Sequence, residues 1–309
     1  MRNLLQQSLS ANTRAAYGSG TNAFIDFCLQ YHRFTAQNSL LPASEETLML
    51  FTSFLSLKVC PATIKVYLAA VHNLHIESCL SDPFETSSLL PRLVRGIKRV
   101  YGQERRPRLL ITPQLLLRFK EKLHLQWHDH FILWSAMLIA FFGFLRSSEL
   151  LALRRNDITV MDSTGQKPTF GVCLCSSKTD PFRHSTVIRI APSNHPTLCP
   201  AKAILLLLNQ PYLQHPSSPL LQRASGTTVN RQSFDNVIKW LACSSSLDDS
   251  QFSTHSFHIG AATTAAVAGI PDCLIRTLGR WSSDAYQLYI HTPNSTLDTI
   301  TSSLASQEL

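Results

Sequence analysis

The feature that most restricts the fold of this chain is an uncharged apolar stretch of 15 residues, from Phe131 to Leu145. A membrane-spanning helix needs about 20 such residues, so this stretch is too short to cross a bilayer. A helix that is apolar on every side has to be covered by other elements in a domain interior. We therefore expect a central, buried helix at 131–145 and no membrane partner.

The length of the chain favours two domains. At 309 residues it exceeds the usual size of one domain. Helical patterns fill its first third, with Ser10 or Asn12, then Ser44, as N-caps, and with Pro61 at a helix start. The sequence predicts a helical domain over 1–103, a basic linker over 104–111 and a second domain over 112–309.

The second domain is predicted to be mainly helical with one small antiparallel sheet. Thr112 and Pro113 are typical of a helix start. Strand patterns occur only at 170–175 and 185–190, and the Asp180-Pro181 pair between them indicates a turn. Further helices are expected to begin at Pro200 and to cover 231–243, 256–268, 272–278 and 284–291.

Positive charge is concentrated around the predicted linker. The net charge is +8, and residues 91–110 hold seven basic residues with Glu104 as the one acid. Such a cluster favours phosphate contacts with duplex DNA, although it also fits a solvated linker or a nuclear import signal. The candidate DNA-binding residues are Arg92, Arg95, Lys98, Arg99, Arg105, Arg106 and Arg108.

Cysteine and histidine spacing gives little support for a metal or a disulfide framework. The eight cysteines are dispersed, and none forms a C-x-x-C pair. His124, His128 and His130 could hold zinc, but no nearby carboxylate or cysteine completes the set. The start of the chain has no sustained apolar core, so no signal peptide is expected. We expect a reduced intracellular protein without cofactors.

Four segments of the second domain carry side chains suited to phosphate chemistry. They read GFLRSSELLAL, SSKTD, THSFHIGAATTAAVAGI and LGRWSSDAYQLYIHTP. The first places an arginine at a helix start, the second a lysine in the predicted hairpin, and the third two histidines one helical turn apart. The candidate residues are Arg146, Lys178, His255, His258, Trp281 and Tyr289.

In order and spacing these segments resemble the tyrosine recombinases, or phage integrases, and most closely those of DIRS-, Ngaro- and Crypton-type mobile elements. The family pattern is Arg, Lys, His-x-x-Arg, His or Trp, and Tyr. The resemblance covers nearly the whole chain. It implies a helical core-binding (SAM-like) domain and a catalytic domain that form a C-shaped clamp on duplex DNA.

The resemblance implies that Tyr289 attacks a DNA phosphate and that Lys178 protonates the leaving 5′ oxygen. Arg146, His255 and Trp281 would then surround the phosphate, because a phosphodiester gathers negative charge in its transition state. A covalent phosphotyrosine conserves the bond energy, so neither ATP nor metal is required. Each residue alone also fits a structural role, and Tyr286 is an alternative nucleophile.

The sequence departs from the family pattern at one position. The second arginine of the pattern is replaced by His258, which offers fewer donors and no permanent charge. Two functions remain open: a recombinase, impaired or not, and a mobile-element-derived protein that binds DNA without cutting it. The sequence predicts that the chain binds DNA but cleaves it poorly or not at all, and that His258→Arg restores or raises cleavage.

The C-terminal segment carries a short apolar stripe at Leu297, Ile300 and Leu304. Related recombinases dock such a terminal helix on a neighbouring protomer. We therefore expect a helix over 295–305 that joins dimers or tetramers on DNA, with packing on its own domain as the alternative. A eukaryotic mobile-element origin would imply a nuclear location, and any other origin a cytoplasmic or nucleoid one.

Overall fold

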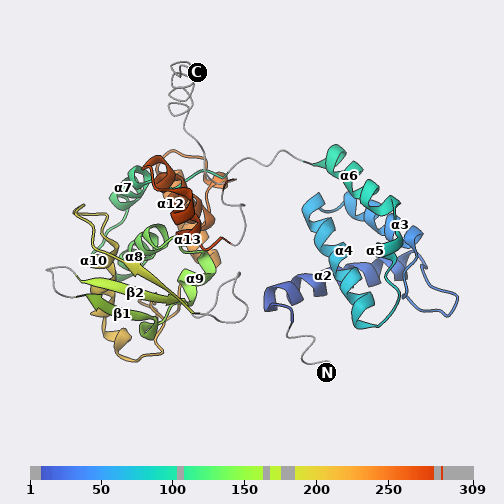
Figure 1. Cartoon of the computed structure of the whole chain (residues 1–309), viewed down its shortest axis with the longest axis horizontal. Coiled ribbons are helices and arrows are strands. Elements are labelled where there is room, and N and C mark those ends of the chain that lie inside the picture. Colours follow the sequence, from blue (N-terminus) through green and yellow to red (C-terminus); the bar gives the residue numbers. More distant parts are fainter. Residues whose placement is uncertain (1–7, 103–107, 163–167, 175–184, 282–286, 288–309) are drawn as a thin grey trace, which may run out of the picture. The chain divides into compact units, whose positions relative to one another are not determined.

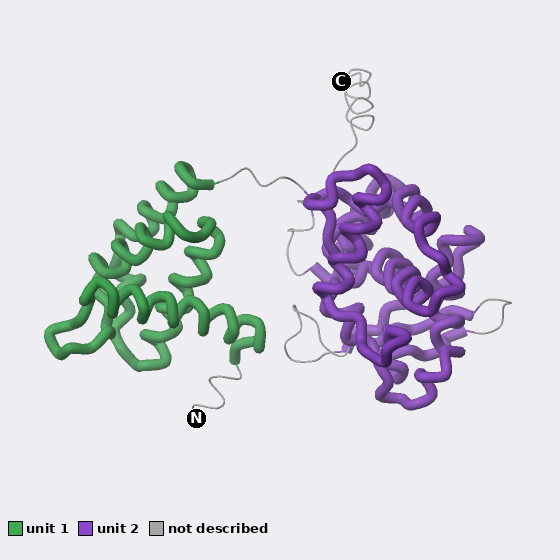
Figure 2. Tube along the Cα trace, turned by 180° about the vertical axis from the view of Figure 1, so that it is seen from behind, with its two compact units in different colours: residues 1–105 green, residues 106–309 purple. Residues whose placement is uncertain are grey.

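A computed structural model describes residues 8–102, 108–162, 168–174, 185–281 and 287. The chain divides into two compact units, residues 1–105 and residues 106–309 (Figure 2). Each unit has a hydrophobic core of its own. The linker expected at 104–111 spans the point of division.

Unit 1 is entirely helical in its described part (Figure 1). The predicted caps act as expected, since the hydroxyls of Ser10 and Ser44 accept hydrogen bonds from the third residue of each helix. Phe24, Phe27 and Phe51 form an edge-packed aromatic centre for the core. Its helices are α2 (Ala11–Gln30), α3 (Glu45–Ser56), α4 (Pro61–Glu77), α5 (Pro83–Thr86) and α6 (Leu89–Tyr101).

Helix α6 places part of the basic cluster on a regular surface. Leu90 and Ile97 are buried on one side of this helix. The side chains of the four basic residues fall within an arc of about 120° around the helix axis, on the side opposite the buried residues, because helical positions advance by about 100° per residue. All four are exposed, and we call them the α6 basic face: Arg92, Arg95, Lys98 and Arg99.

Unit 2 is built around α8 (His128–Phe142), which packs against α10 (Pro200–Leu208) and α12 (His255–Val267) (Figure 1). Ten consecutive residues of α8, from Ile132 to Phe141, are buried. The expectation of a central buried helix is therefore confirmed, with its start earlier and its end three residues sooner than predicted. The other helices are α7 (Pro113–Glu121), α9 (Ser147–Ala152), α11 (Arg231–Ser244) and α13 (Asp272–Gly279).

The sheet of unit 2 has three antiparallel strands in the order β1-β2-β3. Strands β2 (Thr169–Leu174) and β3 (Thr186–Ile190) match the predicted pair. Strand β1 (Ile158–Asp162) was not predicted, because only the first residue of this edge strand is buried and it therefore lacks an alternating pattern. The predicted fold class, mainly α with a small antiparallel sheet, is confirmed.

The helix predicted over 284–291 and the terminal helix over 295–305 lie outside the described residues, apart from Gln287. In the parts of the chain that are described, we find no helix long and apolar enough to cross a bilayer.

Candidate functional site

The site begins at the turn that follows the central helix. Helix α8 ends at Gly143, Phe144 adopts a left-handed conformation with φ of 49°, and Arg146 caps the start of α9. The backbone N–H of Arg146 donates to Oε2 of Glu149 at 2.9 Å, as in a capping box. The prediction that Arg146 stands at a helix start is thereby confirmed, and its side chain is largely buried.

Glu149 is the centre of the site, and it was not among the residues predicted from the sequence. Its side chain is 1% exposed and accepts from two guanidinium groups. Nη1 of Arg146 lies 2.9 Å from Oε1, and Nη2 of Arg280 lies 2.7 Å from Oε2. Nη2 of Arg146 also donates to the carbonyl oxygen of Arg280 at 3.1 Å. A signal was present in the sequence, because an acid three residues after a helix cap is typical of a capping box.

Two left-handed residues face each other across this site. Arg280 ends α13 with φ of 53°, and its Nη2 donates to the carbonyl oxygen of Phe144 at 2.7 Å. The same carbonyl accepts from Nδ1 of His258 at 2.8 Å. A left-handed conformation of a non-glycine residue costs roughly 1–3 kcal/mol and often marks a functional position. Here it directs the Phe144 carbonyl at two side chains from distant segments.

His258 is buried and uncharged. Burial, together with the neighbouring charge of Arg146, lowers its pKa to about 3, against a smaller opposing effect of the Phe144 carbonyl. Because a carbonyl only accepts, Nδ1 carries the proton and Nε2 carries the lone pair. Nε2 is buried and has no partner among the described residues. In this form His258 cannot donate to a phosphate oxygen from Nε2, unlike the arginine of the family pattern.

His255 and Trp281 flank His258. The ring centres of His255 and His258 are 6.0 Å apart, and those of Trp281 and His258 are 4.6 Å apart. The structure thus brings together Arg146, His255, His258 and Trp281, four of the six predicted site residues. Gly279 makes room for the indole, because a Cβ at this position would overlap the ring of Trp281.

The remaining two predicted residues, Lys178 and Tyr289, lie outside the described residues, as does Tyr286. Strands β2 and β3 pair directly, so Lys178 belongs to the segment that joins them.

The predicted DNA-binding residues fall into three groups. Those of the α6 basic face are exposed and make no ion pair within the described residues. Arg108 donates from Nη1 to the hydroxyl of Ser253, just before α12, so it is already engaged within unit 2. Arg105 and Arg106 lie outside the described residues.

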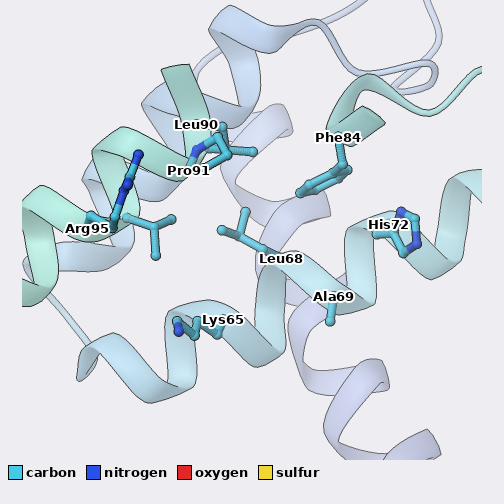
Figure 3. A pocket seen from close by; sticks show the side chains of 9 residues that line it. Lys65, Leu68, Ala69, His72, Phe84, Leu90, Pro91 and Arg95 are labelled. Atoms are coloured by element: carbon cyan, nitrogen blue, oxygen red, sulfur yellow. The ribbon is translucent and has the colours of Figure 1, made fainter. Parts of the chain in front are cut away.

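Unit 1 also contains a cavity of about 500 Å³ between α4, α5 and α6 (Figure 3). Its walls are mostly apolar, with Leu68 and Phe84 facing the interior and Lys65 and Arg95 at its sides. It lies in a different unit from Arg146.

A metal site is not apparent in the described part of the chain, where His, Cys, Asp and Glu form no group of three or more. Two of the histidines considered for zinc are engaged elsewhere. His128 bonds to the carbonyl oxygen of Gln222, and Nδ1 of His130 accepts from the backbone of His124.

No protein-family model matches the sequence, and no curated protein matches it significantly. The fold of this chain does resemble those of solved structures. The lambda integrase dimer bound to a core site is 12% identical, with a TM-score of 0.64, and the match covers 94% of this chain and 92% of that one. XerH site-specific recombinase bound to difH substrate after cleavage is 16% identical, with a TM-score of 0.63 and coverage of 94% and 78%.

A third similar structure is the Tn1549 transposon integrase in complex with transposon right-end DNA, which is 13% identical with a TM-score of 0.60. Its match covers 96% of this chain and 95% of that one. All three are tyrosine recombinases or integrases in complexes with DNA. The helical units and the three-stranded antiparallel sheet accompany this likeness, and the chain has the tyrosine recombinase fold.

Proposed function

We propose that this chain binds duplex DNA and breaks and rejoins it through a phosphotyrosine at Tyr289, in recombination or integration. The observation that carries the proposal is the site around Glu149, in which a buried carboxylate holds Arg146 at a helix start near His258, whose ring lies beside those of His255 and Trp281. A fixed guanidinium in a mostly buried site is suited to the charge of a phosphoryl transition state.

The proposed reaction is balanced without a cofactor. The phenol of Tyr289 gives its proton to a neighbouring base, its oxygen attacks phosphorus, the bond to the 5′ oxygen breaks, and a 3′-phosphotyrosyl link remains. The leaving 5′ oxygen takes a proton, for which Lys178 is the proposed donor. Attack by another 5′-hydroxyl reverses these steps and releases the tyrosine. Arg146 would stabilise the charge that the phosphate oxygens gather.

The α6 basic face is the proposed contact to the DNA backbone. Its four exposed cations lie on one side of a helix whose other side is anchored in the core. Phosphate contacts of this kind release counterions, so affinity should depend steeply on salt.

Covalent capture on a suicide substrate tests the function. A binding site would first be selected from random duplexes, and a 5′-bridging phosphorothiolate placed at each phosphate in turn. The thiol that leaves cannot reverse the reaction, so a cleaving protein accumulates as a covalent adduct. We expect an adduct with the native chain and none with Tyr289→Phe. Equal labelling of the two, or adduct formation through Tyr286, would contradict the assignment of Tyr289.

A second candidate function is DNA binding without cleavage, on a chain derived from a mobile element of the DIRS, Ngaro or Crypton type. The observation that favours it is the neutral, buried His258, which lacks the donor and the charge of an arginine. This function would be supported if the chain binds the selected duplex with high affinity but forms no covalent adduct with any substrate of the phosphorothiolate series. A nuclear location belongs to the same proposal, and imaging of a tagged chain tests it.

Self-association on DNA through residues 295–305 is also proposed. Leu274 and Leu278 on α13 are 52% and 39% exposed, so unit 2 offers apolar side chains for such a helix. Deleting 294–309 should abolish complexes that contain more than one protomer and leave binding of a single protomer. Normal assembly of the truncated chain on paired sites would contradict self-association through residues 295–305.

A further inference from the structure

Arg280 is a buried cation next to the predicted site residue Trp281, and it was not itself among the predicted site residues. Its side chain is 10% exposed, at the C-terminal end of α13. The guanidinium group donates three hydrogen bonds within the described residues. Nη2 donates to Glu149 and to the Phe144 carbonyl, and Nη1 donates to the Leu278 carbonyl at 2.8 Å. Its Nε–H is buried and has no acceptor among the described residues.

The site holds more positive than negative charge. Arg146 and Arg280 both contact Glu149, and His258 between them is neutral. Among the described residues, two guanidinium groups and one carboxylate leave a net charge of +1 in a largely buried space. Burial lowers the pKa of Arg280, and the charge of Arg146 lowers it as well, while Glu149 raises it. Buried charge without a counter-charge is costly, so the arrangement is suited to an added anion.

A purely structural role for Arg280 accounts for only part of this geometry. Glu149 already receives the backbone N–H and Nη1 of Arg146, so both of its oxygens have a donor without Arg280. A second guanidinium adds an unneutralised charge and the unsatisfied Nε–H. An anion bound at the site would neutralise this charge and could accept a hydrogen bond from the Nε–H.

We propose that Arg280 supplies the second guanidinium of the phosphate site, in place of the arginine that position 258 lacks. The inference rests on the proposed function, in which a phosphodiester lies beside Arg146. It makes Arg280 a catalytic residue that contacts a non-bridging phosphate oxygen, and it makes His258 a packing partner. The site then has two guanidinium groups, as in the family pattern, although position 258 is a histidine.

Titration of the full-length chain with inorganic phosphate tests this contact without any DNA cleavage. The ring signals of His258, in protein labelled with ¹⁵N-histidine, report binding at this site alone and exclude binding at the α6 basic face. We compare the native chain with Arg280→Gln, which keeps amide donors for Glu149 and Phe144 but removes the charge, and with Arg280→Lys, which keeps the charge. Arg118→Gln is the control, because Arg118 is an arginine of unit 2 that binds only the Ser245 carbonyl in the described contacts.

We expect phosphate affinity to fall about 10-fold or more in Arg280→Gln, as for loss of a charge-assisted hydrogen bond, and to change less in Arg280→Lys. Arg118→Gln should bind as the native chain does. Thermal unfolding followed by tryptophan fluorescence identifies any variant that fails to fold. The proposal is wrong if the native chain does not bind phosphate at this site, or if folded Arg280→Gln binds it with native affinity.

Adduct formation separates this proposal from the proposed function. Arg280→Gln should form the phosphorothiolate adduct more slowly than the native chain, and adding His258→Arg should restore part of the rate in that background. The absence of adduct from the native chain, with phosphate binding still dependent on Arg280, would remove strand cleavage but keep the anion site. A native adduct rate in Arg280→Gln would remove the role of Arg280 and keep strand cleavage.

Discussion

The burial of His258 predicts that unit 2 loses stability as the pH falls below neutrality. In the unfolded chain an imidazole has a pKa of about 6.5, whereas burial lowers the pKa of His258 to about 3 in the folded protein. Between these two pKa values, the imidazole of residue 258 is protonated in the unfolded state and neutral in the folded state. Lowering the pH therefore favours unfolding, and the contribution is fully present only above about pH 6.5.

The size of the effect follows from the two pKa values. Linkage gives a loss of about 2 kcal/mol between about pH 7 and pH 5, with most of it below pH 6. For a unit of this size, such a change corresponds to a fall in Tm of roughly 4–8 °C.

Tryptophan fluorescence measures this quantity in the intact chain. All four tryptophans, Trp127, Trp134, Trp240 and Trp281, belong to unit 2, so their emission reports the unfolding of that unit alone. Denaturant unfolding of the native chain is compared with His258→Asn, whose amide can still donate to Phe144 but does not titrate. Because the substitution also alters packing, the pH dependences are compared and not the absolute stabilities.

We expect a steeper loss of stability with falling pH in the native chain than in His258→Asn, by about 2 kcal/mol at pH 5. His215→Asn, at an exposed histidine of the same unit, should keep the native dependence. Parallel pH dependences for the native chain and His258→Asn would refute the inference that His258 is buried in its neutral form.

Three further predictions concern other parts of the structure. Replacing the four residues of the α6 basic face with alanine should flatten the log–log slope of DNA affinity against salt by about 3.6 units, which is about 0.9 for each residue, and an unchanged slope would exclude this face from the DNA contact. Glu149→Gln should destabilise unit 2 by about 3–5 kcal/mol in urea unfolding, because it removes the carboxylate from two buried cations, and a loss below about 1 kcal/mol would mean that the pair is not formed in solution. Gly279→Ala should displace Trp281 at a cost of about 1–3 kcal/mol and shift its emission, whereas Gly18→Ala, where a Cβ meets no atom within 4 Å, should leave the emission unchanged.

The structure also changes the expectation for His258→Arg. The sequence alone predicts a gain of cleavage, because an arginine would match the family pattern. In the structure, position 258 is 1% exposed and packed against Trp281, beside two guanidinium groups. A third guanidinium in this space would face charge repulsion and crowding, so we expect a gain only when Arg280 is replaced.

Local signals made much of the fold predictable. Ser10, Ser44, Pro61 and Pro113 mark helix starts because capping depends on a few neighbouring residues. The central helix was predictable because its apolar residues have no exposed side. Strand β1 was not, since an edge strand with outward side chains has no periodic pattern.

The site was predictable only in part, for a different physical reason. Arg146 could be placed because its role at a helix start is local. Arg280 could not, because its partners Glu149 and Phe144 are 131 and 136 residues away in the sequence. The charge state of His258 was equally inaccessible, since it depends on burial among segments that the sequence does not show to be neighbours.

These sequence separations have a consequence for the order in which the protein acquires its properties during synthesis. Unit 1 has its own core and the complete α6 basic face, so it can fold while later residues are still being made. The phosphate site needs the turn at Phe144 and the end of α13 together, and therefore waits for nearly the whole chain. If the α6 basic face binds DNA as proposed, a chain interrupted within unit 2 would occupy DNA without the means to cut it, and would compete with finished copies of the same protein.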